Sequence, residues 1–219
     1  MAARATEPES RRAERRSHHQ SLSRTQLLDA AEEVFGRRGF YETTLRDVAE
    51  LAEFSVGSVY SFFENKEDLY LHVFLRRGEE YLPAMRAVVE EGGGARRQLH
   101  RLVDFEVGFF REHPHFGRLY LRSARAGVPP TSDSPVDRVL VERVDEAMAI
   151  HSEVFSRGQR EGVFCDGDPE VLARLLSGLV SAFHSVDAAV LEGNAAAEER
   201  FPLASLHEMV DRAFQPDRR

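Results

Sequence analysis

The sequence of 219 residues has only one cysteine, Cys165, and only one lysine, Lys66. One cysteine cannot form a disulfide bond within the chain, which fits a reducing cytoplasm. The chain also lacks any uninterrupted run of about 18 apolar residues, so we expect no membrane-spanning helix. Its N-terminus is rich in arginine and has no apolar segment, unlike a secretory signal. We therefore expect a cytoplasmic protein with no membrane partner.

The formal net charge of -8 is distributed unevenly along the chain. Residues 1–66 carry ten Lys/Arg and eleven Asp/Glu, a net of -1, which leaves -7 for residues 67–219. Screening limits charge effects to about 8–10 Å in physiological salt, so an acidic protein can still bind nucleic acid through a local basic segment. Residues 1–22 are arginine-rich and have no sustained apolar period, which predicts a disordered basic arm. This arm either contacts phosphates or is only a solvated tail.

Apolar residues recur with a helical period, and the alternation typical of strands never extends beyond a few residues. The pattern predicts an all-α protein of nine helices with short connections. Two of the predicted helices are short and follow Thr44 and Ser55. The other seven are expected at about 23–38, 65–91, 95–112, 115–126, 136–161, 169–192 and 203–214. The predicted caps are Gly39 at the C-terminus of the first helix, and Thr44 (with Asp47), Ser55 and Asn65 at the N-termini of the next three.

Two short helices joined by a turn of three to four residues have the geometry of a helix-turn-helix. Small residues at the start of the second helix would let it approach the major groove, and a valine there could contact a thymine methyl group. Hydroxyl groups and the single lysine are candidate phosphate donors. The candidate DNA-contacting residues are Thr44, Arg46, Ser55, Val56, Gly57, Ser58, Tyr60 and Lys66. The alternative is a helical hairpin that only packs in a core.

An ordered set of segments within residues 24–70 supports the first interpretation. It comprises Leu28–Ala31, Phe35, Gly39–Phe40, Thr43–Ala49, Ser55–Tyr60 and Phe63–Leu69. Together these segments resemble the DNA-binding domain of the TetR (tetracycline repressor-like) family of regulators. In that resemblance Tyr60 and Lys66 fall on the family's phosphate-contacting tyrosine and lysine. The resemblance implies a ligand-responsive regulator, most often a repressor, that binds a palindromic double-stranded operator as a homodimer.

One residue departs from the family's pattern. Glu53 stands in the turn, where the family usually has glycine. A left-handed backbone there would cost a non-glycine residue about 1 kcal/mol. We therefore expect either a slightly strained turn or a turn of different shape. The residue also places an acid near the DNA.

The resemblance also divides the chain into a helix-turn-helix domain at 23–68 and a helical ligand-sensing and dimerisation domain at 69–219. The predicted helices at 169–192 and 203–214 carry wide apolar surfaces, which favour a four-helix bundle across a two-fold axis. The candidate interface residues are Leu172, Leu175, Leu179, Val186, Leu206, Met209, Val210 and Phe214. The alternative is that these surfaces only close the core of one subunit.

Aromatic residues interspersed with a few polar groups indicate a cavity for a small apolar or aromatic effector. The candidate ligand-binding residues are Phe105, Phe109, His113, Phe116, Tyr120, Met148, His151 and Phe183. Phe110 and Phe155 lie on the same segments, and any of these residues alone could equally be ordinary core. The polar residues that could orient a ligand are Arg101, Glu106, Arg143 and His184.

Other functional classes have little support in the sequence. It contains no G-x-S-x-G elbow, no glycine-rich phosphate loop and no H-E-x-x-H motif, so we expect neither an enzyme nor a cofactor. The pairs His18–His19 and His113–His115 lack the helical spacing of metal ligands, so we expect no metal. Thiol sensing by Cys165 would lack a second cysteine to resolve the oxidised group. A purely structural dimer module is the remaining alternative.

Overall fold

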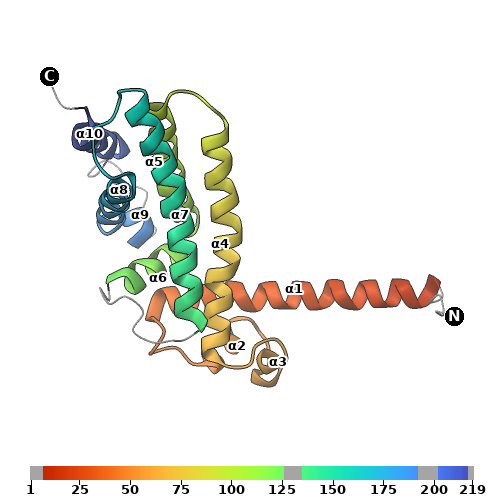
Figure 1. Ribbon diagram of the computed structural model, residues 1–219. Coiled ribbons are helices and arrows are strands. Elements are labelled where there is room, and N and C mark those ends of the chain that lie inside the picture. The colour runs from red at the N-terminus through yellow and green to blue at the C-terminus, as the bar shows by residue number, and fades with distance from the viewer. Residues whose placement is uncertain (1–6, 126–134, 192–201, 217–219) are drawn as a thin grey trace. The chain divides into compact units, whose positions relative to one another are not determined.

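The computed structural model describes residues 7–125, 135–191 and 202–216. Within these ranges the chain forms nine helices of five residues or more and the four-residue helix α9, with no strand (Figure 1). The all-α class predicted from the periodicity is confirmed. None of the described helices combines the length and the apolar character that a membrane span requires. The chain divides into two compact units, Met1–Val73 and Phe74–Arg219.

The first unit contains α1 (Glu7–Arg38), α2 (Leu45–Leu51), α3 (Val56–Tyr60) and the first turns of α4 (Lys66–Glu90). Because α1 begins at Glu7, the prediction of a disordered arm over 1–22 is wrong for residues 7–22, and residues 1–6 lie outside the described residues. This stretch has no glycine and is rich in arginine and glutamate, which favour helix. Its only proline, Pro8, lies in the first turn, where the missing N–H is tolerated.

The predicted end of α1 and the predicted start of α2 are both confirmed. Gly39 has a φ of 85° and donates its N–H to Phe35 O at 2.8 Å, which ends α1. Thr44 and Asp47 form a capping box at the start of α2. The Asp47 N–H donates to Thr44 Oγ1 at 3.2 Å, and the Thr44 N–H donates to Asp47 Oδ2 at 2.8 Å.

The caps predicted for α3 and α4 are confirmed as well. Ser55 Oγ accepts from the Ser58 N–H at 3.0 Å, and Asn65 Oδ1 accepts from the Asp68 N–H at 2.8 Å. Apolar side chains from all four helices then form the core of this unit. The fully buried ones are Leu27, Ala31, Phe35, Val48, Ala49, Val59, Leu69 and Val73. The helix-turn-helix is therefore held by local caps on the outside and by one apolar cluster inside.

The turn between α2 and α3 keeps a left-handed residue without a glycine. Glu53 has a φ of 60°, and it is the only non-glycine with positive φ among the described residues. Its N–H donates to Glu50 O at 3.3 Å, and the Phe54 N–H donates to Ala49 O at 2.9 Å. These two bonds make the pattern of a Schellman motif, which requires the left-handed residue where Glu53 stands. Of the two expectations for this residue, the structure shows the strained turn.

Replacing Glu53 with glycine should raise the free energy of unfolding by about 1 kcal/mol, because glycine adopts positive φ without a Cβ clash. Thermal melting followed by circular dichroism should show a rise of about 2–4 °C for a chain of this size. Glu53→Gln is the matched control, since it removes the charge and keeps the Cβ. An equal rise in both variants would attribute the effect to the carboxylate and not to the backbone.

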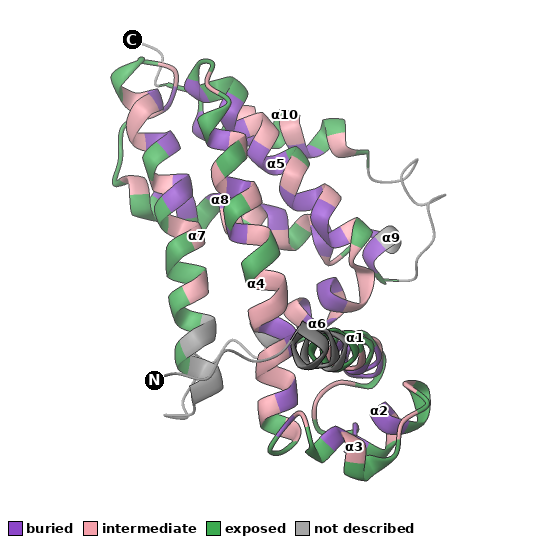
Figure 2. Cartoon of the chain, turned by 90° about the vertical axis from the view of Figure 1, so that its right-hand side faces the viewer, coloured by how far each residue is buried: buried purple, intermediate pink, exposed green. Residues whose placement is uncertain are grey.

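The second unit contains the rest of α4 and the helices α5 to α10. Their bounds are α5 Ala95–Glu112, α6 Pro114–Arg125, α7 Pro135–Arg160, α8 Pro169–His184, α9 Ala188–Leu191 and α10 Leu203–Phe214. The single helix predicted over 169–192 is thus interrupted after His184, where Ser185 is the C-cap. Figure 2 shows the buried residues gathered on the inward faces of these helices. The core cluster includes Met85, Leu99, Leu102, Ile150, Phe155, Leu176, Val180 and Val210.

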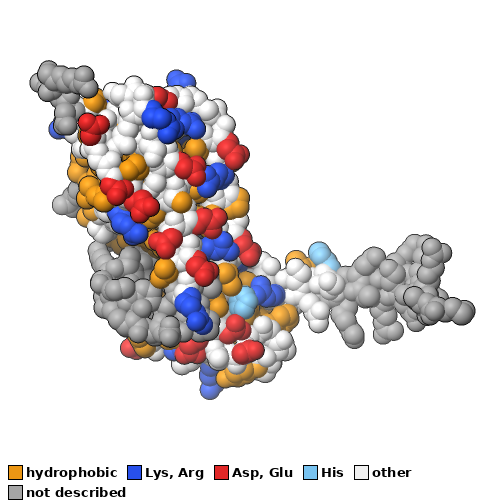
Figure 3. All heavy atoms as spheres, viewed as in Figure 1, with side chains coloured by type: hydrophobic (Ala, Val, Ile, Leu, Met, Phe, Trp, Pro, Cys, Tyr) orange, Lys and Arg blue, Asp and Glu red, His pale blue; other side chains and the backbone are white. Residues whose placement is uncertain are grey.

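Two kinds of contact fix the helices of this unit around the core. Gly158 lets the Phe164 ring, from the loop after α7, pack directly on that helix, since a Cβ at Gly158 would lie 1.9 Å from an atom of the ring. On the outside, acidic and basic side chains are interspersed over the face shown in Figure 3. One of these pairs is Arg86–Glu153, at 2.7 Å, which joins α4 to α7. Such exposed pairs contribute at most about 1 kcal/mol each, so burial dominates the stability of the unit.

Candidate nucleic-acid interface and effector interior

The outer surface of α3 is made of small and apolar residues. Val56 is 37% exposed and Tyr60 is 58% exposed. Ser55 Oγ and Ser58 Oγ lie 2.8 Å apart, so these two hydroxyl groups already bond to each other. The surface that the sequence predicted to face DNA is therefore exposed, and its helix is capped.

Gly57 has no role inside the folded unit that would require glycine. A Cβ at this position would meet nothing closer than Ser55 Oγ, at 3.8 Å. Glycine at an exposed position in a helix costs about 1 kcal/mol relative to alanine. Packing within the unit therefore does not explain why glycine stands here.

The predicted contacts on α2 are bonded within their own helix. The Thr44 hydroxyl donates to Asp47 Oδ2 at 2.6 Å, and Arg46 pairs with Glu50 at 2.9 Å. The hydrogen bonds from Thr44, followed by the nearby Arg38 guanidinium, lower the pKa of Asp47. Arg38 lies 2.8 Å from the same carboxylate. These contacts hold the start of α2 rigidly against the end of α1.

Lys66 connects two distant segments of the first unit. Its Nζ donates to Phe40 O and to Thr43 O, each at 3.0 Å, and lies 4.3 Å from the centroid of the Phe40 ring. The ammonium therefore ties the start of α4 to the loop between α1 and α2. Two of its three N–H donors are used in this way, which leaves one for an external acceptor. Sequence reasoning missed this structural role, because the bonds join residues 23 and 26 positions apart.

Comparison with known proteins places this unit in a family. Residues 27–73 match the profile described as bacterial regulatory proteins, tetR family. This segment of the chain belongs to the tetR family. Its helix-turn-helix is therefore that of a DNA-binding transcriptional regulator, as the sequence resemblance predicted.

The relatives of this chain extend beyond the first unit. An uncharacterised HTH-type transcriptional regulator of Bacillus subtilis, YhgD, is 25% identical over 70% of this chain and 78% of its own length. The repressor KstR2 of Rhodococcus jostii is 35% identical, over only 36% of this chain and 39% of its own length. A crystal structure of a tetR-family regulatory protein from Rhodococcus RHA1 superposes with a TM-score of 0.72. That likeness covers 90% of this chain and 98% of the other at 21% identity, and it supports the fold alone.

The interior of the second unit brings the predicted aromatic residues together. The rings of Phe109 and His113 lie 4.7 Å apart, and those of Phe110 and Phe116 lie 5.9 Å apart in a stack. Tyr81 on α4, which the sequence did not single out, joins this aromatic cluster. Its members are Tyr81, Phe105, Phe109, Phe110, His113, Phe116 and Tyr120.

A buried ion-pairing contact adjoins this cluster. His151 Nε2 lies 2.6 Å from Glu106 Oε1, and both side chains are buried. His151 Nδ1 lies 3.1 Å from Ala147 O, and a carbonyl oxygen can only accept, so Nδ1 carries a proton. The short contact at Nε2 then needs one more proton, held by either residue. The Glu106–His151 pair is therefore neutral overall.

Desolvation and the nearby Glu106 carboxylate together raise the pKa of two tyrosines. Burial is the main cause for both Tyr81 and Tyr120, and Coulomb repulsion from Glu106 adds to it. Both hydroxyl groups therefore stay protonated at physiological pH. They can donate hydrogen bonds in an interior that is otherwise lined by rings.

His184, on the last turn of α8, is the least satisfied polar group of this interior. Neither of its ring nitrogens has a hydrogen-bond partner, and the residue is only 1% exposed. Its ring lies 4.6 Å from that of Phe110. Burial lowers the pKa of His184 to about 4, a shift that Glu106 and Asp187 oppose and Arg111 supports. The side chain is uncharged at neutral pH, as a buried imidazole without a partner should be.

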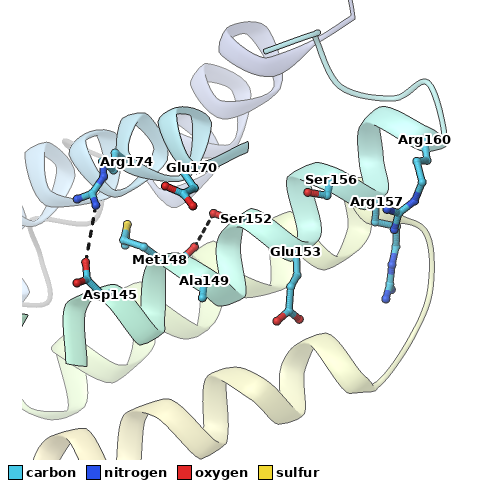
Figure 4. Close-up of a pocket in the computed structure, with 10 residues that line it drawn as sticks. All are labelled: Asp145, Met148, Ala149, Ser152, Glu153, Ser156, Arg157, Arg160, Glu170 and Arg174. Carbon is cyan, nitrogen blue, oxygen red and sulfur yellow. Dashed lines mark hydrogen bonds and ion pairs between the residues drawn. The ribbon is translucent and has the colours of Figure 1, made fainter. Parts of the chain in front are cut away.

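Of the remaining two predicted ligand residues, Met148 lies apart from the aromatic cluster, and the Phe183 ring lies 6.3 Å from that of His184. Met148 lines an open groove between α7 and α8, shown in Figure 4. Asp145 and Arg174 pair across this groove at 3.7 Å. Phe183 is half-buried, and the Arg111 guanidinium lies 5.9 Å from its ring centroid. The polar residues Arg101 and Arg143, which could have oriented a ligand, bond Gly92 O and Glu146 instead.

Half of the predicted dimer residues belong to the core of the single chain. Leu172, Leu206, Val210 and Phe214 are buried, so their assignment to a subunit interface is wrong. They pack in the cluster of α5, α7, α8 and α10, which is the alternative that the periodicity had left open. Leu179 is half-buried against the same cluster. Leu175, Val186 and Met209 remain exposed, by 56%, 44% and 53%, and Val171, which the sequence did not single out, is also exposed.

The described residues contain no group of three or more His, Cys, Asp or Glu that could hold a metal ion. A different histidine cluster links α5 to α10. His207 Nε2 lies 2.8 Å from Asp104 Oδ1, and His100 Nε2 lies 2.9 Å from Asp211 Oδ1. The two Nδ1 atoms are 3.0 Å apart. This chain of contacts clamps the half-buried side of α10.

Stability should fall in acid because of His184. Between the ordinary pKa of 6.5 and the folded value of about 4, the unfolded chain binds a proton that the folded chain does not, so stability decreases as the pH drops. His184→Phe should remove up to ~3 kcal/mol of this dependence. Urea unfolding at pH 7, 5.5 and 4.5 would measure it. His18→Ala, at an exposed histidine, should keep the wild-type dependence; an unchanged slope in His184→Phe would refute the assignment.

Proposed function

We propose that this regulator is a homodimeric repressor. Its α3 helices read a palindromic operator, and a small apolar or aromatic effector bound in the second unit releases it. The observation that best supports operator reading is Gly57, whose missing side chain has no explanation within the folded unit. A bare backbone at the start of a helix is what close approach to base edges in the major groove requires.

The groups around α3 would position it by binding phosphates. Tyr60 is exposed on α3, and the third N–H donor of Lys66 is directed by the two carbonyl bonds that fix the ammonium. Such contacts set orientation and register but carry no sequence information. Val56, also exposed, supplies an apolar surface for a thymine methyl group. The Thr44 hydroxyl already donates to Asp47 Oδ2 at 2.6 Å, so it stabilises the start of α2.

Gly57→Ala should stabilise the fold slightly and weaken operator binding by about tenfold or more, because the added methyl group keeps α3 from the bases. The operator would first be selected from a random DNA pool, and affinities then measured at fixed salt. Gly108→Ala is the matched control, since its Cβ on α5 also enters open space and gains the same helix propensity. Equal affinities for both variants would contradict the placement of α3 in the groove.

The exposed face of α8 is the surface proposed for dimerisation. Its exposed positions are Glu170, Val171, Arg174, Leu175, Gly178 and Ala182, of which two are charged, and the exposed Val186 follows the end of the helix. A Cβ at Gly178 would meet nothing within 4 Å, so the small residues leave room for a second helix to approach. The exposed Met209 extends the apolar surface onto α10. Two copies of α8 and α10 would then form a four-helix bundle that relates the two operator half-sites.

Leu175→Arg should convert the dimer into a monomer, because it would bury an unpaired charge in the bundle. Light scattering coupled to gel filtration would give the mass, and circular dichroism would show unchanged helix content. Val141→Arg is the control, since Val141 is exposed on α7, outside the proposed surface. A Leu175→Arg chain that remains dimeric would exclude α8 as the interface.

Release by an effector would act through α4. The boundary between the two units falls within this helix, so α4 contributes Lys66 to one unit and Tyr81 to the other. Pro83 lies inside the helix and removes one backbone donor, which makes bending easier at this point. A ligand that prefers one tilt of α4 shifts the population of the dimer toward it. The two α3 helices then leave the spacing of about 34–36 Å that adjacent major grooves require.

A further inference from the structure

We infer that the effector places an uncharged hydroxyl or carbonyl group against His184, on a flat aromatic or polycyclic body that lies among the rings of the aromatic cluster. This inference rests on the proposed effector site in the second unit and specifies its ligand. It excludes effectors whose inserted end is ionised, such as carboxylates, phosphates and ammonium groups.

The first argument for a polar group on the ligand is the imidazole of His184, which has no hydrogen-bond partner. His184 is buried, and both of its ring nitrogens lack a hydrogen-bond partner. An uncharged imidazole has one N–H donor and one lone pair, so it can pair with a group that both donates and accepts. A hydroxyl group does both, and a carbonyl group satisfies the donor. Because unpaired polar groups are costly in an apolar interior, such a ligand gains free energy that an alkyl group would not.

The second argument, that this group is uncharged, is that the charges around His184 cancel. The groups that act electrostatically on its ring are Glu106, Asp187 and Arg111. Arg111 Nε donates to Asp187 Oδ2 at 2.8 Å, so this pair is neutral. Glu106 Oε1 lies 2.6 Å from His151 Nε2, so its charge is balanced within that pair. No net charge remains to compensate an ionised ligand, which would have to enter without a counter-charge.

The third argument concerns the shape of the ligand, which the aromatic rings next to His184 indicate. The Phe110 ring lies 4.6 Å from the His184 ring and 5.9 Å from Phe116. Tyr120 lies 5.2 Å from Phe110, and its protonated hydroxyl can supply a second donor. Rings favour flat ligands that stack or meet them edge to face. Phenols and hydroxylated or keto polycycles combine this body with the required polar group.

Three probes of one shape separate the alternatives: 2-naphthol, 2-naphthoate and naphthalene, titrated calorimetrically into the full chain at pH 7. The neutral naphthol should bind at least tenfold more tightly than the anionic naphthoate, and also more tightly than naphthalene. His184→Phe should reduce the affinity for naphthol to that for naphthalene, while the ligand-free melting temperature rises because a buried unpaired group is gone. His184→Leu serves as the second variant if phenylalanine disturbs the packing.

A control variant tests whether naphthol binds instead in the groove between α7 and α8. Ala149→Trp fills that groove at an exposed position and should leave naphthol binding unchanged. The inference is overturned if naphthoate binds as tightly as naphthol. Naphthol affinity that survives both His184 variants, or no measurable naphthol binding, would overturn it equally. Operator binding is measured separately with the same preparations, so a failure of the repressor function would be recognised independently of the ligand result.

Discussion

The ammonium group of Lys66 is the contact on which the geometry of the DNA-binding unit depends. It bonds the carbonyl oxygens of Phe40 and Thr43 and lies over the Phe40 ring, so one charge closes the loop that separates α1 from α2. The next residue, Thr44, is the N-cap of α2. The direction of α2, and through its turn that of α3, is thus fixed from the first residue of α4. A substitution of Lys66 would disturb this arrangement as well as any phosphate contact, so the two effects must be separated by measuring stability.

The parts of the fold that the sequence predicted correctly are those decided by nearby residues. A cap is made by groups three or four positions apart, as at Thr44 and Asp47, so the pattern of residue types contains the whole interaction. Burial on α8 is different. Leu172 and Leu175 are both apolar and both fit a helical period, yet one is buried and the other exposed. Which of them faces the core depends on where α5 and α7 lie, and this information is not local.

In the interior of the second unit, too, the sequence predicts local features and misses contacts between distant residues. The aromatic residues on α5 and α6 could be recognised, because so many rings within the sixteen residues from Phe105 to Tyr120 are unusual. The partnership of Glu106 with His151 joins positions 45 apart, and the isolation of His184 is a property of its surroundings. Tyr81 was missed because it stands on a different helix, α4, far in sequence from the aromatic residues of α5 and α6. Which polar groups of this interior are hydrogen-bonded therefore depends on how the helices pack and cannot be predicted from the sequence alone.

These constraints meet in α4, which begins at the Lys66 contact and continues into the aromatic cluster at Tyr81. Tyr81 follows Lys66 by fifteen positions, so the same helix contributes a residue to each unit. A ligand that prefers the tilted helix by 1.4 kcal/mol would change the ratio of the two states about tenfold, so a modest preference at His184 suffices to regulate α3.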